Sequence, residues 1–197
     1  MSRAQRTRTG SQLRIIGGQW RGRKLDFSPA PGLRPTGDRI RETLFNWLAA
    51  DIHGARCLDL FAGSGALGLE ALSRGAAHCD FVDTAGPALR DIEKHLKTLA
   101  AEDQGSCHQL PAVDFLLRNR GPWDVLFLDP PFGENQLAPV CNALDTSRPL
   151  AIGSLVYVET GRGETLPPLP PTWELHRDKR AGEVSYRLFV VGPEQKG

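Results

Sequence analysis

The chain has 197 residues, 40% of them apolar, and this length suits one globular domain with a small extension. No apolar run approaches the ~18 residues that a membrane span needs, and the basic start at residues 1–10 lacks the apolar stretch of a signal peptide. We therefore expect a cytoplasmic protein. The four cysteines have neither metal-binding nor disulfide spacing, so we expect reduced thiols and no metal; they are Cys57, Cys79, Cys107 and Cys141.

Charge is distributed unevenly along the chain, although the net charge is only +1. Residues 1–41 carry ten Lys and Arg residues against two acids, a local charge of +8. The remainder carries 14 basic and 21 acidic residues, a charge of −7. A basic arm on an acidic body indicates a partner that bears phosphate groups, with a merely solubilising tail as the alternative.

Two elements are predicted before residue 50. The segments Leu13–Ile16 and Gly18–Leu25 have the pattern of short strands that pair as a hairpin about Gly17-Gly18. The first long helix is predicted to begin at Pro35-Thr36-Gly37-Asp38, a helix-start signal. Apolar residues then follow at helical spacing, namely Ile40, Leu44, Trp47 and Leu48.

Strand and helix patterns alternate from residue 57 to residue 158, which predicts a parallel, doubly wound α/β sheet with helices on both faces. Two last strands, Trp173–Arg180 and Glu183–Val191, form an antiparallel hairpin about Ala181-Gly182. This combination is the Rossmann-like fold of class I methyltransferases, with seven strands. We divide the chain into a basic arm (1–34), a catalytic domain (35–192) and a tail (193–197). The other predicted strands are Cys57–Phe61, Cys79–Val82, Ser106–Leu110, Val125–Leu128 and Leu155–Val158, and the helices are Ala66–Arg74, Pro87–Leu99, Val113–Arg118 and Gln136–Leu144.

A glycine-rich turn, Gly63-x-Gly65-x-x-Gly68, follows the first of these strands and opens a helix. Glycines let a ligand approach the backbone closely, and the pattern suits both NAD and S-adenosylmethionine. Asp59 favours S-adenosylmethionine, because its carboxylate can face the cationic amino end of the methionine moiety but would repel a pyrophosphate. Asp83, at the end of the next strand, can accept hydrogen bonds from both ribose hydroxyls of either cofactor.

The segment Asp129-Pro130-Pro131-Phe132 follows a buried strand, at the sheet edge where open α/β sheets bind ligands. A heterocyclic amine is a poor nucleophile, because its lone pair is delocalised into the ring. The carboxylate of Asp129 and the carbonyl of Pro130 can hold the amine hydrogens while the nitrogen pyramidalises, and the prolines fix both acceptors. Phe132 offers a face on which a splayed base can stack. The segment therefore predicts methylation of an amine on a base.

Four blocks of the sequence resemble the bacterial 16S ribosomal RNA guanine-N2 methyltransferases, and the resemblance covers nearly the whole chain. Arg14–Leu25 and Arg34–Leu48 are the distinctive blocks, whereas Asp59–Gly75 and Asp129–Phe132 recur in many amino methyltransferases. The resemblance implies that S-adenosylmethionine is the cofactor and that one guanine in the head of the small ribosomal subunit is methylated on N2. It also implies that the arm helps to grip RNA and that Thr36–Arg41 lies near cofactor and base.

The resemblance and the motifs together give a set of expected site residues. Three positions differ from the family pattern: Asp83 is shorter than the usual Glu, Gly37 replaces a commoner hydroxyl residue, and Pro111 stands where an Asp or Asn often contacts the adenine edge. An alternative interpretation of Arg39 and Arg41 is that they are ordinary solvated charges on the surface of the helix. We expect Asp129, Pro130 and Phe132 to be catalytic, Asp59, Ala62, Gly63, Ser64, Gly65, Asp83 and Thr36 to bind cofactor, and Arg14, Arg21, Arg23, Lys24, Arg34 and Arg39 to bind RNA.

Other functions stay open from the sequence alone. A DNA or protein-glutamine amino methyltransferase would share both motifs, although Phe132 and the basic arm favour RNA guanine. An NAD-dependent oxidoreductase would explain the glycines and Asp83 but gives Asp59 and Asp129 no role. A non-catalytic RNA-binding assembly factor would explain the arm but not the amine-holding segment. We expect a monomer that acts on 16S RNA within the small subunit or its assembly intermediate.

Overall fold

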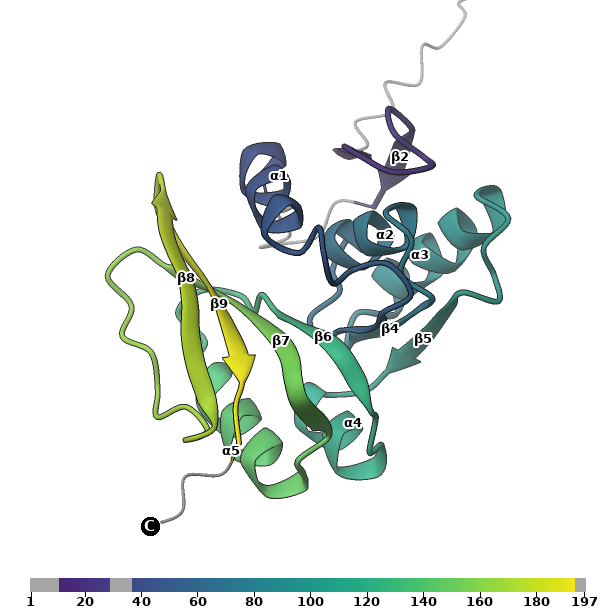
Figure 1. The fold of residues 1–197 in the computed structure, drawn as a ribbon. Coiled ribbons are helices and arrows are strands. Elements are labelled where there is room, and N and C mark those ends of the chain that lie inside the picture. The colour runs from purple at the N-terminus through teal and green to yellow at the C-terminus, as the bar shows by residue number, and fades with distance from the viewer. Residues whose placement is uncertain (1–10, 29–36, 194–197) are drawn as a thin grey trace, which may run out of the picture.

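A computed structural model describes residues 11–28 and 37–193, and a seven-stranded sheet forms its centre (Figure 1). The strand order is β5-β4-β3-β6-β7-β9-β8, with β3 to β7 parallel and β9 antiparallel to both of its neighbours. The predicted fold class is therefore confirmed. The elements of the sheet and its helices are α1 (Asp38–Trp47), β3 (Arg56–Asp59), α2 (Ala66–Ser73), β4 (His78–Asp83), α3 (Gly86–Thr98), β5 (Gly105–Gln109), α4 (Ala112–Arg118), β6 (Trp123–Leu128), α5 (Leu137–Ser147), β7 (Leu150–Gly161), β8 (Trp173–Ala181) and β9 (Val184–Val191).

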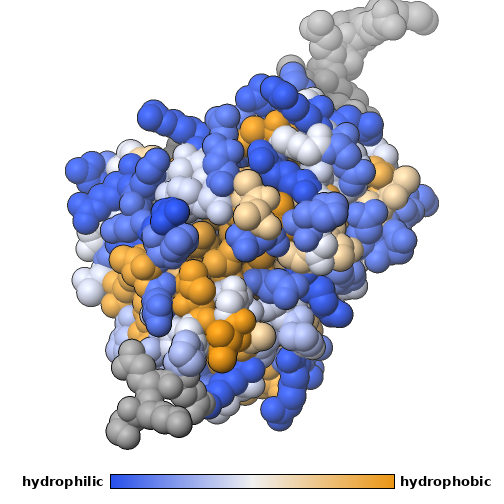
Figure 2. Space-filling model, viewed as in Figure 1, coloured by the Kyte–Doolittle hydropathy of each residue, from blue (hydrophilic) through white to orange (hydrophobic). Residues whose placement is uncertain are grey.

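Alternate residues of the central strands enter two separate apolar clusters. In β6, Val125 and Phe127 pack into the cluster that contains α1, α2 and α3, whereas Leu126 and Leu128 pack into the cluster that contains α4 and α5. Side chains of a strand point alternately to the two faces of its sheet, so both faces must be covered. In Figure 2, apolar residues gather in the middle of the view, over β7 and β9, and hydrophilic residues surround them.

Strand β7 is longer than the apolar pattern indicated. The sequence predicted Leu155–Val158, but β7 begins at Leu150 and ends at Gly161. Its first residues are exposed and pair with β6 through a register shift near Trp123, and its last residues pair with β9. The apolar pattern detected only the apolar part of the buried segment, because the buried Ser154, Glu159 and Thr160 are polar. This extension carries Glu159 into the molecule at the carboxyl end of the parallel strands.

The arm contributes a two-stranded hairpin, β1 (Ser11–Arg14) and β2 (Lys24–Phe27), which pair antiparallel. The predicted tight turn at Gly17-Gly18 is wrong, because residues 15–23 form a wide loop. The loop is held by α2 instead: Gln19 N–H donates to the Ser73 carbonyl, and the Ser73 hydroxyl donates to the Gly17 carbonyl. Gly18 has a φ of 75°, and a Cβ there would collide with the Ser73 carbonyl.

Glu70 of α2 joins the arm, α1 and α2. Its side chain is fully buried, and it accepts hydrogen bonds from Ile16 N–H (2.9 Å) and Gly17 N–H (2.8 Å). The guanidinium groups of Arg74 (2.8 Å) and Arg41 (3.4 Å) supply two ion pairs. Arg41 is itself only 1% exposed, so the alternative of a solvated helix charge is wrong for this residue. A buried carboxylate is stable only with such partners.

The predicted thiol state can be checked on the described parts of the chain. All four cysteines are free thiols there, three of them buried. No helix within residues 11–28 and 37–193 is long and apolar enough to cross a membrane.

We predict that Glu70→Gln lowers the free energy of unfolding by about 1.5–3 kcal/mol, because the guanidinium groups of Arg41 and Arg74 both lose a charged acceptor, while Arg41 keeps its ion pair with Asp38. The amides of Ile16 and Gly17 should also lose protection from hydrogen exchange. Urea unfolding and hydrogen exchange measure the two effects. Glu93→Gln, at an exposed position of α3, serves as control and should change stability by less than about 0.5 kcal/mol. Equal stability of the two variants would contradict the role of Glu70.

Candidate active site

A cavity of about 830 Å³ opens at the carboxyl ends of β3, β4 and β6. Small-molecule sites commonly have volumes of about 300–1,000 Å³ and lie at this edge of a parallel sheet. Gly37 and Ile40 at the start of α1 line one wall. Most of the predicted site residues also line it, and these are Asp59, Ala62, Gly63, Ser64, Asp83, Asp129, Pro130 and Phe132.

The glycine loop joins β3 to α2. Gly65 is not among the lining residues; it is the residue before α2, where its φ of 76° is left-handed. Gly68 lies under the loop, where a Cβ would collide with the ring of Phe81 and lie 2.7 Å from the Cys79 sulfur. The two glycines therefore allow the sharp entry into α2 and its close approach to β4.

Asp59 and Asp83 both brace the glycine loop. Asp59 is 2% exposed and accepts a hydrogen bond from Gly68 N–H at 3.0 Å. Burial raises the pKa of Asp59 to about 7, the Gly68 hydrogen bond opposes the shift, and the charges of Asp129 and Asp83 add to it. Asp83 accepts from Gly63 N–H and Ala85 N–H, both at 2.8 Å. Each Asp83 oxygen keeps a second lone pair, so the predicted ribose contact stays possible.

The Asp129–Phe132 segment leaves β6 directly into the cavity. Pro130 is buried, Asp129 is half-buried, and the Phe132 side chain is 44% exposed at the mouth. An apolar ring this exposed is unusual in a well-packed domain and is typical of a ligand-binding surface. The geometry therefore brings an amine-holding turn, a stacking ring and a glycine loop to one cavity.

Glu159 is the site residue that the sequence analysis missed. It lines the same cavity, is 4% exposed, and accepts a hydrogen bond from the Tyr157 hydroxyl at 2.7 Å. Burial raises the pKa of Glu159 to about 8, the charge of Asp129 adds to the shift, and the Tyr157 hydrogen bond opposes it. A carboxyl on an apolar strand was the available signal, because a buried acid needs a reason to be there.

Two other parts of the lining were also not anticipated. Glu183 and Val184, at the tip of the β8–β9 hairpin, close the side beyond α1. Leu110, Pro111 and Ala112 line the opposite side, where the pattern of the family led us to look for a polar adenine contact. Asp114, which lies nearby in the sequence, does not line the cavity. This side of the cavity therefore offers apolar contact from its side chains.

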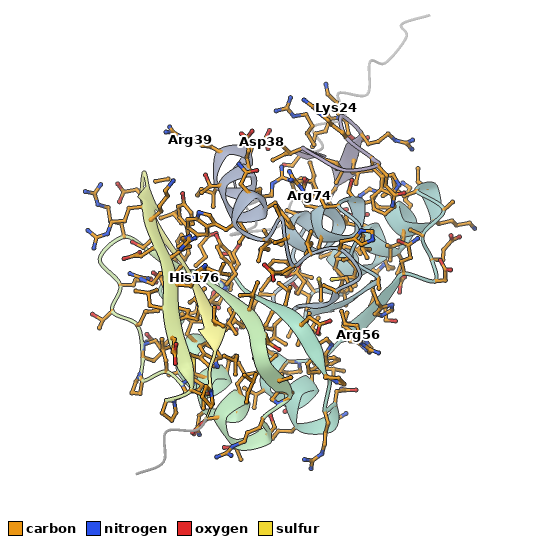
Figure 3. The ribbon with its side chains drawn as sticks, in the orientation of Figure 1. Lys24, Asp38, Arg39, Arg56, Arg74 and His176 are labelled. Carbon is orange, nitrogen blue, oxygen red and sulfur yellow. The ribbon has the colours of Figure 1, made fainter. Side chains whose placement is uncertain are left out.

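The predicted RNA-binding cations that fall within the described residues lie on the hairpin β1–β2, on its loop and on α1. Arg21, Arg23, Lys24 and Arg39 are exposed, and Figure 3 shows Lys24 and Arg39 pointing outward at the same end of the molecule. Arg14 is half-exposed but forms an ion pair with Asp38 at 2.8 Å. Thr36 and Arg34 lie outside the described residues.

Comparison with protein families identifies the chain. The family model described as conserved hypothetical protein 95 matches residues 13–190. The chain belongs to this family. Its relatives include two proteins called ribosomal RNA small subunit methyltransferase D. The one from Escherichia coli K12 is 49% identical over 178 residues, covering 90% of this chain and 89% of the relative. The one from Haemophilus influenzae is 43% identical over 192 residues, covering 96% and 99%.

Solved structures agree with this membership of the conserved hypothetical protein 95 family. A putative methyltransferase, yhhF from Escherichia coli, is 46% identical, with a TM-score of 0.85 and coverage of 92% of this chain and 99% of that one. An RNA methyltransferase from Salinibacter ruber, solved with S-adenosyl-L-homocysteine, shares the fold at 14% identity and a TM-score of 0.62, covering 83% and 97%. The methyltransferase relatives confirm the predicted cofactor, S-adenosylmethionine, and the NAD-dependent alternative is not supported.

The residues of this family member fit that cofactor. S-adenosylmethionine has a cationic ammonium group. Such a cation stabilises the ionised form of the buried Asp59 carboxyl. The glycine loop leaves room for a ligand beside the backbone, and Asp83 lies within the same cavity for ribose hydroxyls. Within residues 11–28 and 37–193, no group of three or more His, Cys, Asp or Glu side chains is arranged to hold a metal ion.

The raised pKa of Glu159 makes stability depend on pH. The ordinary pKa of 4.5 applies to the unfolded chain and about 8 to the folded protein. Between these values the folded protein holds a proton that the unfolded chain has released. The free energy of unfolding therefore falls as pH rises through this window. Below about pH 4.5 Glu159 is protonated in both the folded and the unfolded state, so it no longer lowers the free energy of unfolding.

We predict that Glu159→Gln raises the free energy of unfolding by about 2 kcal/mol at pH 8, because an amide is not charged in the folded protein. The gain should shrink towards zero near pH 5. Urea unfolding of the wild type and of Glu159→Gln at both pH values gives the difference in their free energies of unfolding. The titration of other groups, such as Asp59, affects both proteins and cancels in this difference. A gain of equal size at pH 5 and pH 8 would contradict the buried-carboxyl explanation.

Proposed function

We propose that this protein uses S-adenosylmethionine to methylate the exocyclic N2 amine of a guanine in 16S ribosomal RNA of the small subunit. One observation carries the proposal: the Asp129–Phe132 segment and the glycine loop line the same cavity. The relatives called ribosomal RNA small subunit methyltransferase D support ribosomal RNA as the substrate. The choice of guanine N2 rests on the sequence resemblance and is the finer part of the proposal.

The proposed chemistry needs the amine to be held as it reacts. Asp129 and the Pro130 carbonyl accept its two hydrogens, which keeps the nitrogen lone pair available, and Phe132 stacks against the ring. When bound, the cofactor supplies a methyl group on a sulfonium, an electrophile that needs no further activation. The nitrogen then has one proton too many, and Asp129, already hydrogen-bonded to it, is the acceptor within reach. Positioning and charge stabilisation account for the rest of the rate.

The exposed cations of the arm and α1 provide the contacts to RNA phosphates in this proposal. Arg21, Arg23, Lys24 and Arg39 are all exposed. Arg14 contributes less, because Asp38 already neutralises it. The acids that line the cavity repel phosphate, so the backbone stays at the cations while a base enters.

Transfer of labelled methyl groups tests the reaction and the substrate together. Small subunits, naked 16S RNA and DNA are offered separately, using subunits from a host that lacks this protein, and the labelled nucleoside is identified. N2-methylguanosine from subunits or RNA is the expected product. Label in another nucleoside, in DNA or in protein would refute the guanine assignment and leave a methyltransferase of different specificity.

We predict that Asp129→Ala lowers kcat by about 10²–10³-fold, because one acceptor for the developing charge is lost. Cofactor affinity should change little, since Asp129 is assigned to the amine. Single-turnover methyl transfer and cofactor titration measure the two quantities. Asp103→Ala, an exposed acid in the loop after α3, is the matched control and should retain full activity. Full activity of Asp129→Ala would contradict the role assigned to Asp129.

We predict that Arg21→Gln combined with Arg23→Gln weakens RNA binding and makes it less sensitive to salt. The slope of log affinity against log salt should decrease in magnitude by about 1.5, since each lost phosphate contact removes about 0.7–0.9. RNA binding titrations at several salt concentrations give the slope. The double variant Arg118→Gln with Arg120→Gln, at the exposed end of α4, makes the same change in net charge and should leave the slope unchanged.

A further inference from the structure

Glu159 and Asp129 occupy equivalent positions at the ends of neighbouring parallel strands. Leu128 of β6 pairs with Val158 of β7, and each acid follows its paired residue by one position. Glu159 is two residues beyond Tyr157, and Asp129 is two beyond Phe127, so both side chains point to the same face of the sheet. Two carboxyl groups therefore lie side by side in the cavity.

A hydrogen bond from Tyr157 fixes the orientation of the Glu159 side chain. Its Oε2 accepts from the hydroxyl of Tyr157, which is fully buried between the rings of Phe127 and Tyr186. Among the described residues, no group donates a hydrogen bond to the other oxygen, Oε1. Because Glu159 lines the cavity, Oε1 is left for a ligand.

The sheet order indicates which ligand this is. The residues assigned to the cofactor, Asp59 and Asp83, are the last residues of β3 and β4. Asp129 directly follows β6, which is the neighbour of β3 on the side away from β4. Glu159 belongs to β7, one strand further from the glycine loop. A group beyond Asp129 lies on the substrate side of the reacting amine. Glu159 therefore faces the base and not the cofactor.

We propose that Glu159 is the residue that selects guanine, by accepting a hydrogen bond from N1–H through Oε1. The inference rests on the proposed function and names the residue behind its specificity. Guanine has a ring N–H next to its exocyclic amine. Adenine and cytosine have a bare ring nitrogen there, which is an acceptor. An acceptor placed beside the amine-holding pair therefore favours guanine and repels the other two amino bases.

The protonation of Glu159 depends on the base that binds. Burial and the charge of Asp129 raise the pKa of Glu159, so its carboxyl holds a proton before a base binds, and an N–H donor such as guanine N1–H favours the ionised, accepting form. Guanine brings three N–H bonds along one edge and so can satisfy both carboxyl groups. A base with a lone pair at the same position would leave Oε1 of Glu159 without a donor, and an acceptor left unsatisfied in this way disfavours the ligand strongly.

The test changes one base of the substrate and one side chain of the protein. The probe is small-subunit RNA that carries either guanosine or 2-aminopurine riboside at the nucleotide methylated by the wild-type protein. 2-Aminopurine keeps the amine but lacks both N1–H and the 6-oxo group. The loss of the oxo group is common to all protein variants, so its effect cancels when their preferences are compared. We expect the wild type to prefer guanosine in kcat/KM by about 10–100-fold, the usual effect of losing a hydrogen bond to a charged group. Glu159→Leu should reduce this preference by about tenfold or more.

The kcat/KM for both RNA probes is measured with the same enzyme preparation. A loss of folded protein lowers both values equally and therefore does not change their ratio. Glu159→Gln, expected to be the more stable variant, should reduce the preference in the same direction but less. Glu134→Leu removes an exposed carboxyl that lines the same cavity and should leave the preference unchanged. A preference in Glu159→Leu within about twofold of the wild type, the normal limit of additivity, would overturn the proposal.

Product analysis separates the two possible failures. Methylation of guanine N2 with an unchanged preference overturns the role of Glu159 alone. Methylation of another base or of protein by the wild type overturns the proposed function, and the role of Glu159 falls with it.

Discussion

The buried carboxylate of Glu70 is the interaction on which the site depends. A charge with no exposure is stable only if donors surround it, and here they come from the arm backbone, α1 and α2. Satisfying Glu70 therefore brings three segments distant in sequence to one place. Arg41 then binds Asp38 at 2.7 Å and fixes the start of α1, whose Gly37 and Ile40 form a wall of the cavity. An electrostatic requirement in α2 thus holds the arm against α2 and places the start of α1 at the cavity.

The parallel sheet supplies the second part of the design. Asp59, Asp129 and Glu159 follow alternate residues that enter one apolar cluster, so their side chains share a face and an edge of β3, β6 and β7. Burying three acids together raises the pKa of Asp59 and Glu159 and costs stability. That cost is the kind expected at functional sites, where groups are held ready for ligands that carry the opposite charge or N–H donors.

The sequence revealed those parts of the structure that depend on local pattern. Alternating buried strands and helices gave the fold class, and motif spacing gave Asp59, Asp83 and Asp129. The turn of the N-terminal hairpin was wrong, because Gly17 and Gly18 serve contacts with Ser73 and Glu70 that lie more than fifty residues away in sequence. Glu159 was missed for the same kind of reason. The position of Glu159 beside Asp129 depends on which strand pairs with β6, and a local sequence pattern does not determine the order of strands in a sheet.

Charge is divided between the exposed N-terminal hairpin and the interior of the cavity, and this division has a physical consequence. The cations Arg21, Arg23 and Lys24 are outside, whereas the interior is lined by carboxyl groups. A phosphate is attracted to the first region and repelled by the second, and an N–H-rich base edge has the opposite preference. RNA can satisfy both only if the backbone stays outside while one base is turned inward. The arrangement therefore favours an unpaired or everted nucleotide over a base that remains stacked in a helix.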